Sequence, residues 1–191
     1  MIIGITGGSG CGKTTLLNCI AEKGGLILDC DAIYHRLLQT DANLLLAIEN
    51  RFPGVVENSM LQRKKLGNIV FADEKALADL NQITHAAVKK EVLRQLETAP
   101  QLAAIDAIAL FEGNLAELCD VTVAVTAPTE DRVRRLMARD GISEEYARKR
   151  IEAQRSCNDF SAVCRYTLEN NGDIGVFYAK CLAFLSEFDI I

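Results

Sequence analysis

A glycine-rich segment near the start of the chain has the residue types and spacing of a phosphate-binding loop. It reads Gly7-Gly8-Ser9-Gly10-Cys11-Gly12-Lys13-Thr14 and fits the pattern G-x-x-x-x-G-K-[ST]. Glycines let successive backbone N–H groups curl around phosphate oxygens, and a following helix adds the positive end of its dipole. Lys13 would carry positive charge to the β- and γ-phosphates, and Thr14 would offer its hydroxyl to Mg²⁺. The segment therefore predicts binding of a nucleoside triphosphate.

The residues on either side of this segment can form the strand and the helix that such a loop requires. Ile2–Thr6 is apolar and predicts a buried strand, and a helix is expected from about Lys13 because leucines follow at helical spacing. A glycine-rich turn beside a surface lysine is the alternative, but it does not need these flanking elements. Kinases, GTPases, ATPases and nucleotide-dependent switches all use the loop. Because the sequence has no Asn-Lys-x-Asp motif for guanine and little length for a motor, we favour a small-molecule kinase.

The rest of the chain alternates short apolar runs with longer helical patterns, which predicts an α/β fold with a parallel sheet. Further strands are expected over residues 26–28, 103–110, 121–125 and 166–168. Between them, helical patterns cover 32–38, 44–51, 66–71 and 75–96, which is too much helix for one crossover connection. We therefore expect a helical subdomain at the strand ends. The pattern ends with helices over 129–138 and 143–154, an Asp140-Gly141 break between them, an Asn170-Asn171-Gly172 turn and a closing helix over 174–188.

Length and composition fit a single domain, since the chain has 191 residues and a typical domain has roughly 150. We expect a core of about 1–30, 101–128 and 165–191, a helical insertion of about 31–100 and a lid of about 129–164. The net charge of −5 argues against nucleic-acid and anionic-membrane partners. The apolar runs are too short to span a membrane, the start lacks signal-peptide features, and the seven cysteines contain no Cys-x-x-Cys pair. We expect a cytoplasmic monomer with free thiols.

Several further segments follow the order and spacing of one enzyme family. They are Ile5 to Thr15, Asp29-Cys30-Asp31, Leu66-Gly67-Asn68-Ile69-Val70-Phe71, Leu80-Asn81-Gln82-Ile83-Thr84-His85, Asp106 with Leu110-Phe111-Glu112, Arg135-Leu136-Met137-Ala138-Arg139, Ala147, Arg150-Ile151, Gln154 and Asn170-Asn171-Gly172. Over nearly its whole length the chain thus resembles the dephospho-CoA kinases. Two positions depart from that family, because Ala86 and Ile108 stand where similar proteins usually have proline. Since proline would end regular strand pairing, Ile108 can let the strand continue past Asp106.

The resemblance implies a three-layer P-loop kinase fold with a parallel sheet, an inserted helical subdomain that binds the acceptor, and a helical lid. It also implies ATP-dependent phosphorylation of the ribose 3'-hydroxyl of dephospho-CoA, which gives coenzyme A in the last step of its biosynthesis. ATP and dephospho-CoA would be the substrates, and Mg²⁺ would accompany ATP. The alternatives are a P-loop kinase of another small acceptor, such as a nucleoside monophosphate or shikimate, and a nucleotide-dependent switch without an acceptor.

Carboxylates near the predicted strand ends are candidates for catalysis. Asp31 follows the second strand and can either take a proton from an acceptor hydroxyl or cap a helix, and the resemblance implies a catalytic base. Asp29 can orient water or Mg²⁺. Asp106 lies in an apolar strand, where a charge needs a cation or hydrogen bonds, so we expect it to bind Mg²⁺ and substrate. Glu112 can work with Asp106 or cap the next short helix.

Arginines at a spacing of three and four residues, Arg132, Arg135 and Arg139, share one face of the predicted lid helix. A solvated, ion-paired face is the alternative. Resemblance to the lids of small-molecule kinases assigns Arg139, together with Arg150 of the next helix, to the nucleotide phosphates, whereas Arg132 is expected at the surface. Cys11 is expected to serve as a small residue whose thiolate the loop amides can stabilise, which would make it sensitive to oxidation.

His85 is either a satisfied buried side chain or, as the resemblance implies, part of the acceptor site.

The expected site residues fall into four groups. The catalytic group is Lys13, Asp31 and Arg139; the acceptor group is Asp31, His85 and Asp106; the Mg²⁺ ligands are Thr14 and Asp106; and the ATP-binding group is Gly7, Gly8, Ser9, Gly10, Cys11, Gly12, Lys13, Thr14, Thr15 and Arg139.

Overall fold

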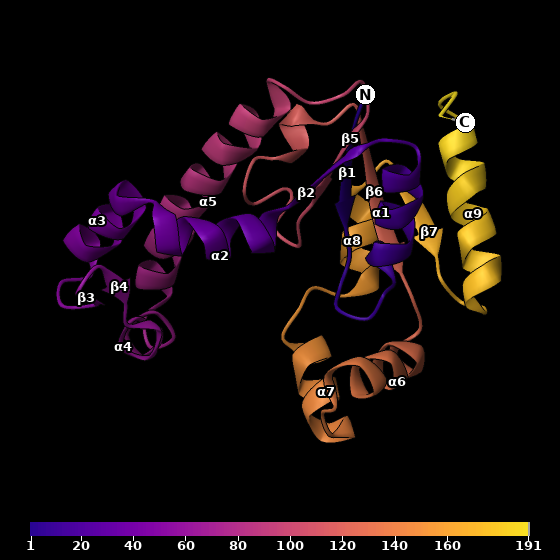
Figure 1. The fold of residues 1–191 in the computed structure, drawn as a ribbon. Helices are drawn as coiled ribbons and strands as arrows, with labels where there is room; N and C mark the ends of the chain where they lie inside the picture. Colours follow the sequence, from indigo (N-terminus) through magenta and orange to yellow (C-terminus); the bar gives the residue numbers. More distant parts are fainter. Residues whose placement is uncertain (191) are drawn as a thin grey trace. The chain divides into compact units, whose positions relative to one another are not determined.

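The computed structural model describes residues 1–190, and Figure 1 traces the chain. Two compact units can be distinguished. The first, here called the sheet unit, consists of residues 1–28, 99–110 and the chain from 116 onward. The second, here called the helical unit, consists of residues 29–98 and 111–115.

The sheet unit is built on five strands in the order β2-β5-β1-β6-β7. Their bounds are β1 Ile2–Thr6, β2 Leu26–Asp29, β5 Ala103–Asp106, β6 Val121–Thr126 and β7 Tyr166–Glu169. The central strand β1 pairs in parallel with β5 and β6, and β6 pairs in parallel with β7. Because β1 is covered on both faces, Ile3 and Ile5 are fully buried, as the apolar run predicts. The prediction of an α/β fold with a parallel sheet is confirmed.

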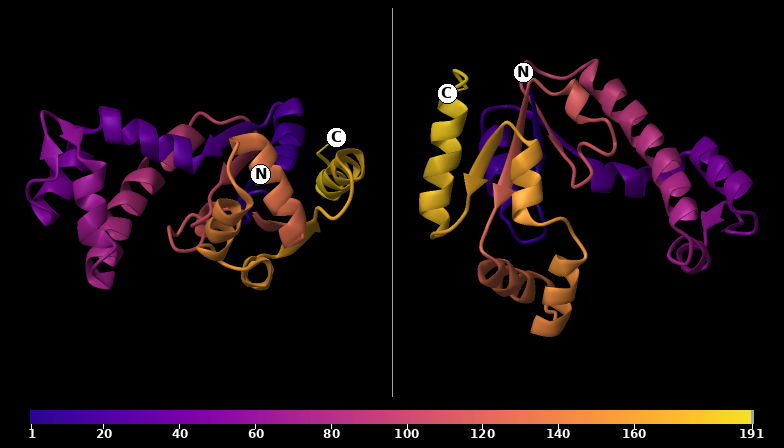
Figure 2. Two further views of the ribbon diagram at one scale, coloured as in Figure 1. Left: turned by 90° about the horizontal axis from the view of Figure 1, so that it is seen from below. Right: turned by 180° about the vertical axis from the view of Figure 1, so that it is seen from behind.

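Helices cover both faces of this sheet and give three layers. Helix α1 (Lys13–Glu22) packs against α9 (Ile174–Ser186), while α8 (Cys157–Val163) packs on β6. Figure 2 shows α1 and α8 on opposite faces of the sheet. The core between the layers is apolar and includes Leu16, Ile20, Val123, Phe177 and Leu185.

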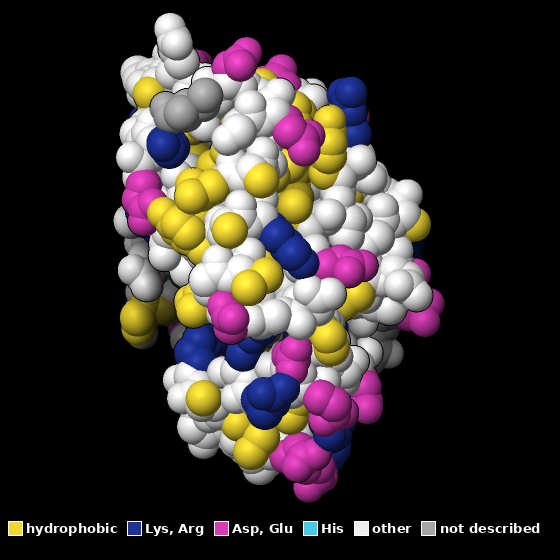
Figure 3. All heavy atoms as spheres, turned by 90° about the vertical axis from the view of Figure 1, so that its right-hand side faces the viewer, with side chains coloured by type: hydrophobic (Ala, Val, Ile, Leu, Met, Phe, Trp, Pro, Cys, Tyr) yellow, Lys and Arg dark blue, Asp and Glu magenta, His cyan; other side chains and the backbone are white. Residues whose placement is uncertain are grey.

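Two charged helices, α6 (Thr129–Asp140) and α7 (Glu144–Glu152), lie at the end of the sheet where the segment after β1 turns (Figure 1). They share a small apolar cluster of Val133, Leu136, Ala147 and Ile151. Gly141 ends α6 in the left-handed conformation, with φ of 66°, so the break predicted at Asp140-Gly141 is confirmed. In Figure 3, the face below α9 shows Lys and Arg side chains interspersed with Asp and Glu.

The helical unit is organised around its longest helix, α5 (Glu74–Leu96). Helices α2 (Cys30–Thr40), α3 (Ala42–Arg51) and α4 (Arg63–Val70) all pack against α5, and a short antiparallel hairpin joins α3 to α4. Its strands are β3 Val56–Glu57 and β4 Met60–Leu61. Aspartates cap three of the helices, since Asp29, Asp41 and Asp73 accept backbone hydrogen bonds at the starts of α2, α3 and α5. The helices predicted between the second and third strands are confirmed.

Some expected elements differ from the observed ones. The strand predicted over 103–110 ends at Asp106, so the expectation that Ile108 continues the pairing is wrong. The reason is that β1 ends at Thr6, where the chain leaves the sheet, and Ala107 donates the last backbone hydrogen bond to Ile5. The sequence pattern does not predict the hairpin or helix α8, and the short helix expected after Glu112 is the 3-10 turn η1 (Ala116–Leu118). Within residues 1–190, no helix has the length and apolarity needed to cross a membrane.

Candidate active site

The glycine-rich segment lies between β1 and α1, as a phosphate-binding loop must. Gly7, Gly10 and Gly12 have φ values of 140°, 79° and 100°, a region that other residues rarely adopt. At Gly7 a side chain would also collide with the neighbouring strand, since a Cβ atom would lie 2.2 Å from the backbone oxygen of Val125. The glycines are therefore required by the backbone path of the loop.

The structure brings together two of the predicted site residues, Lys13 and Asp106. The Lys13 Nζ donates to the backbone oxygen of Gly7 at 2.9 Å and lies 3.8 Å from Oδ1 of Asp106. The two side chains are only 15% and 18% exposed, so the ammonium group supplies the cation that a carboxylate at the end of an apolar strand needs. Thr14, at the start of α1, is exposed. The loop lysine and the strand aspartate thus form one charged pair.

Side chains from outside the loop hold three of its backbone carbonyls. Arg132 donates to the oxygen of Ser9 at 2.9 Å, Arg135 to that of Gly10 at 3.2 Å, and Asn170 to that of Cys11 at 2.9 Å. The surface position expected for Arg132 is wrong, because this side chain is only 3% exposed. The sequence contains a signal for this burial, since Arg132 shares a helix face with the apolar Leu136, which is also buried.

Gln154, two residues beyond α7, contacts Ser9 twice. Its Oε1 accepts from the Ser9 N–H at 2.8 Å, and its Nε2 donates to the Ser9 hydroxyl at 2.9 Å. Neither contact is evident from the sequence, because the two residues are 145 positions apart.

Cys11 is fully buried, with its Sγ 4.0 Å from that of Cys157. Burial raises the pKa of the Cys11 thiol to about 11, and the nearby Arg132 guanidinium offsets this only in part. The expectation of a stabilised thiolate is therefore wrong, because the thiol stays protonated at neutral pH. The desolvation of the charged form outweighs the attraction of the neighbouring cations.

Arg139 and Arg150, expected at the nucleotide phosphates, both bind the carboxylate of Asp140. Arg139 makes two hydrogen bonds to it, at 2.7 and 3.0 Å, and Arg150 makes one at 2.7 Å. The Arg139 hydrogen bonds hold the pKa of Asp140 below its usual range. Because the Arg139 side chain is 59% exposed, this ion pair contributes little stability. Arg139 can therefore leave the Asp140 carboxylate for another anion at low energetic cost.

A pocket of about 630 Å³ opens beside the last part of the loop. It is lined by Gly12, Thr15, Asp131, Arg134, Arg135 and the segment Asn170 to Ile174. Ile174 is 77% exposed and offers an apolar surface, while Asn170 is buried and anchored to the loop and to the backbone of Thr126. The pocket therefore combines an apolar side chain with polar groups, as ligand pockets commonly do.

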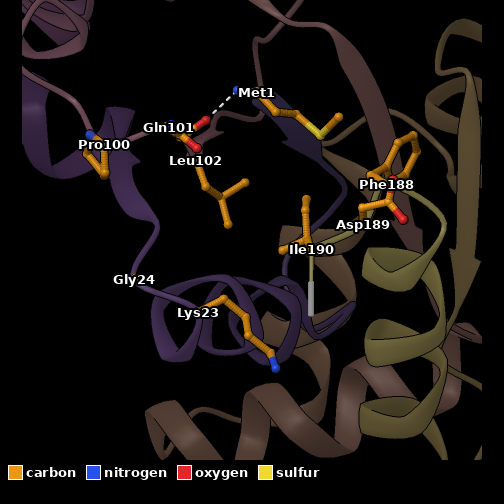
Figure 4. A pocket seen from close by; sticks show the side chains of 9 residues that line it. All are labelled: Met1, Lys23, Gly24, Pro100, Gln101, Leu102, Phe188, Asp189 and Ile190. Carbon is orange, nitrogen blue, oxygen red and sulfur yellow. Dashed lines mark hydrogen bonds between the residues drawn. The ribbon is translucent and has the colours of Figure 1, made fainter.

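Another pocket of the sheet unit, about 680 Å³ in volume, lies at the opposite ends of the strands (Figure 4). Met1 and Pro100 to Leu102 line it, just before β1 and β5 begin, and the N-terminal amine donates to the Gln101 carbonyl. Ligands of open α/β sheets bind at the carboxyl ends of the strands, where the glycine-rich loop lies. This second pocket is therefore not the candidate active site.

In the helical unit, the predicted residues Asp29 and Asp31 have distinct surroundings. Asp29 caps α2, because its Oδ1 accepts from the N–H of Ala32 at 2.9 Å. Asp31 is the second residue of α2 and is exposed, so its alternative interpretation as the helix cap is wrong. The residue that caps α2 is Asp29, two positions before Asp31.

His85 is half-buried on α5 and lines a pocket of about 480 Å³ in the helical unit. The other lining residues are Ala78, Asn81, Gln82, Ala86, Lys89, Glu112, Gly113 and Asn114. The alternative interpretation of His85 as a satisfied buried side chain is not supported, because the side chain is only half-buried. Amide, ammonium and carboxylate groups converge there, so the pocket is suited to a polar ligand.

The strand order with the loop after β1, the Lys13–Asp106 pair and the helices α6 and α7 define the fold of a P-loop kinase. A family model described as dephospho-CoA kinase matches residues 1–175, and the chain belongs to that family. The dephospho-CoA kinase of Thermobifida fusca is 36% identical over 174 residues, which cover 89% of this chain and 87% of that protein. The dephospho-CoA kinase of Saccharomyces cerevisiae is 32% identical over 191 residues, or 94% and 79% of the two chains.

Two solved structures share this fold. The protein TT1252 from Thermus thermophilus superposes with a TM-score of 0.80 at 32% identity, over 98% of this chain and 97% of that chain. A shikimate kinase from Bacteroides thetaiotaomicron has a TM-score of 0.56 at 16% identity, over 99% and 98% of the two chains, and shares the fold alone.

Proposed function

We propose that the protein is an ATP-dependent kinase that phosphorylates the ribose 3'-hydroxyl of dephospho-CoA to give coenzyme A. The observation that carries the proposal is the glycine-rich loop with its partly buried Lys13–Asp106 pair, in a chain of the dephospho-CoA kinase family.

The donor would bind at the loop and the pocket beside it. Loop amides and Lys13 would surround the β- and γ-phosphates of ATP. Its adenine base would lie in the pocket lined by Arg135, Asn171 and Ile174. Support comes from the backbone path of the loop, which requires glycines, and from the apolar surface of Ile174 next to it.

Mg²⁺ would be held by the Thr14 hydroxyl and the Asp106 carboxylate, together with phosphate oxygens. Oxygen donors of this kind are those that Mg²⁺ prefers, and an ion with few protein ligands is typical of phosphoryl-transfer sites. Among residues 1–190 there is no cluster of three or more His, Cys, Asp or Glu side chains for a metal. The residues fit an ion that arrives with the nucleotide, and it would neutralise charge on the phosphates.

The acceptor would be activated by Asp31. Its carboxylate would take the proton of the 3'-hydroxyl while the hydroxyl oxygen bonds to the γ-phosphorus and the bond to the β–γ bridging oxygen breaks, releasing ADP. The exposed position of Asp31, free of the capping task that Asp29 performs, supports this role. His85 and its pocket would bind part of the acceptor.

Arg139 would stabilise the charge of the transferring phosphoryl group from the lid formed by α6 and α7. Its exposed pairing with Asp140 supports this proposal, because the arginine can exchange a carboxylate for phosphate oxygens without large loss. We further propose that the enzyme acts as a monomer in the cytoplasm, where the free thiols of its cysteines would stay reduced.

A coupled assay of ADP release with a panel of acceptors tests the proposal. We expect turnover with dephospho-CoA and little with nucleoside monophosphates or shikimate. Turnover with one of those acceptors but none with dephospho-CoA would point to a different kinase. Slow ATP hydrolysis without a phosphorylated product would instead point to a nucleotide-dependent switch.

A further inference from the structure

Arg132 carries a charge that is buried next to the phosphate loop. Its Nε donates to the Ser9 carbonyl, its Nη2 lies 3.3 Å from Oε1 of Gln154, and its Nη1 lies 3.7 Å from Sγ of Cys157. Within residues 1–190, these hydrogen-bond partners are all neutral. A buried guanidinium surrounded by neutral acceptors is unfavourable unless an anion reduces its cost. The arrangement is thus suited to a loop that receives phosphates.

Gln154 links Arg132 and Ser9 into one hydrogen-bonded group. Its Oε1 accepts from both the Ser9 N–H and the Arg132 guanidinium, while its Nε2 binds the Ser9 hydroxyl. Gly8 leaves room for this group, because a Cβ atom there would lie 2.3 Å from Nη2 of Arg132 and 3.1 Å from Oε1 of Gln154. A side chain at position 8 would therefore displace the Arg132 guanidinium from its present contacts.

These contacts fix the direction of the peptide group between Ser9 and Gly10. In a trans peptide the C=O and the following N–H point in opposite directions. When Arg132 holds the Ser9 carbonyl, the N–H of Gly10 is directed to the other side of the loop. Gln154 fixes the preceding peptide through the Ser9 N–H, and it does so from a residue just beyond α7.

We propose that Arg132 and Gln154 are positioning residues for the phosphoryl donor. They hold Ser9 so that the loop amides are set for the phosphates before the nucleotide arrives, and they tie this geometry to α7. The inference rests on the proposed binding of ATP by the loop, and it assigns to these two residues a role that does not require contact with the acceptor.

A double-mutant cycle on the full chain tests the proposal, with the affinity for ATP and Mg²⁺ measured by calorimetry. We expect Gln154→Ala to weaken ATP binding about tenfold, because two hydrogen bonds to the loop are lost. Ser9→Ala removes only the hydroxyl contact and should weaken binding by a smaller factor. In the Gln154→Ala background, Ser9→Ala should have no further effect, since its partner is already absent.

Two further variants and two further measurements make the test specific. Lys149→Ala, at an exposed position on α7 that pairs with Glu145, is the matched control and should bind ATP like the wild type. Arg132→Lys keeps the charge but lacks the planar fork that reaches both Ser9 and Gln154, so it should share the loss of affinity. The affinity for dephospho-CoA and the melting temperature of Gln154→Ala should stay close to those of the control.

Wild-type affinity for ATP in Gln154→Ala, or purely additive effects of the Ser9 and Gln154 changes, would overturn the proposal. So would parallel losses of ATP affinity, dephospho-CoA affinity and thermal stability, which would mark a merely structural role. If the wild type binds ATP but not dephospho-CoA, the proposed acceptor is wrong, while the ATP measurements still decide the roles of Arg132 and Gln154.

Discussion

Lys13 and Asp31 have different tasks in the proposed reaction, so their substitution separates donor binding from transfer. Lys13→Ala removes positive charge at the phosphates and should weaken ATP binding as well as lower kcat by about 10²-fold or more. Asp31→Asn removes the proton acceptor and should lower kcat by about 10²–10⁴-fold. Its affinity for ATP should be unchanged. Steady-state kinetics with calorimetric binding of ATP check both results.

Asp29→Asn is the control for the Asp31 change, because asparagine also caps helices well. It should retain activity if the task of Asp29 is to cap α2, as its hydrogen bond to Ala32 indicates. Full transfer activity in Asp31→Asn would remove Asp31 from the catalytic role.

At the residue scale, the sequence predicts those site residues whose function depends on local spacing. The loop from Gly7 to Thr14 follows a fixed pattern, and Asp106 draws attention as a charge in an apolar strand. The contacts of Arg132 and Gln154 with Ser9 escape such reasoning because they span 123 and 145 positions. The state of Cys11 depends on burial, which its place in the motif does not reveal.

The proposed phosphoryl transfer requires helices α6 and α7 to close over the phosphates. A kinase must exclude water when the phosphoryl group moves, and arginines brought over the phosphates would also stabilise the developing charge. These helices have only a small apolar cluster of their own, so we expect their amides to exchange faster than those of the central strands. Hydrogen exchange with and without a nonhydrolysable ATP analogue and dephospho-CoA should show added protection over residues 132–155.

Equal protection in the two states would rule out closure driven by ligands. A kinetic companion is Arg139→Ala, which should lower kcat more than it weakens dephospho-CoA binding, because its proposed contact is with the donor. Lys149→Ala, on the exposed face of α7, provides the matched comparison.

At the element scale, hydrophobic periodicity predicts the existence of the main helices and strands better than their ends. The apolar run over 103–110 suggests a long strand, but pairing stops at Asp106 because the neighbouring β1 ends there. The β3–β4 hairpin escapes prediction because its strands have two residues each and its turn uses Asn58 and Ser59 at positive φ rather than glycine.

For the whole molecule, buried thiols predict how stability depends on pH. Burial raises the pKa of Cys11 to about 11 and those of Cys119 and Cys181 to about 12, from an ordinary value of 9.0. Since the unfolded chain ionises first, these groups should contribute full stability below pH 9.0, and this contribution should be lost as the pH rises through 11 and 12. Thermal unfolding in reductant across this range measures the effect.

Other side chains, such as tyrosine and lysine, also lose protons in alkali. The effect of a buried thiol is therefore measured by comparing the wild type with a cysteine variant. Cys181→Ala should be less stable at neutral pH because it leaves a cavity, but its melting temperature should fall less steeply above pH 9.0. An identical slope in the variant and the wild type would contradict the assigned effect of thiol burial.

The proposed kinase activity is tested most directly by following the γ-phosphoryl group of ATP to dephospho-CoA. The full chain would be incubated with γ-labelled ATP, Mg²⁺ and dephospho-CoA, and the product examined by mass spectrometry and phosphorus NMR. We expect label in a single new phosphate on the ribose 3'-oxygen, formed by the wild type and far more slowly by Lys13→Ala. Label found only in inorganic phosphate, or on an alternative acceptor while dephospho-CoA is unchanged, would contradict it.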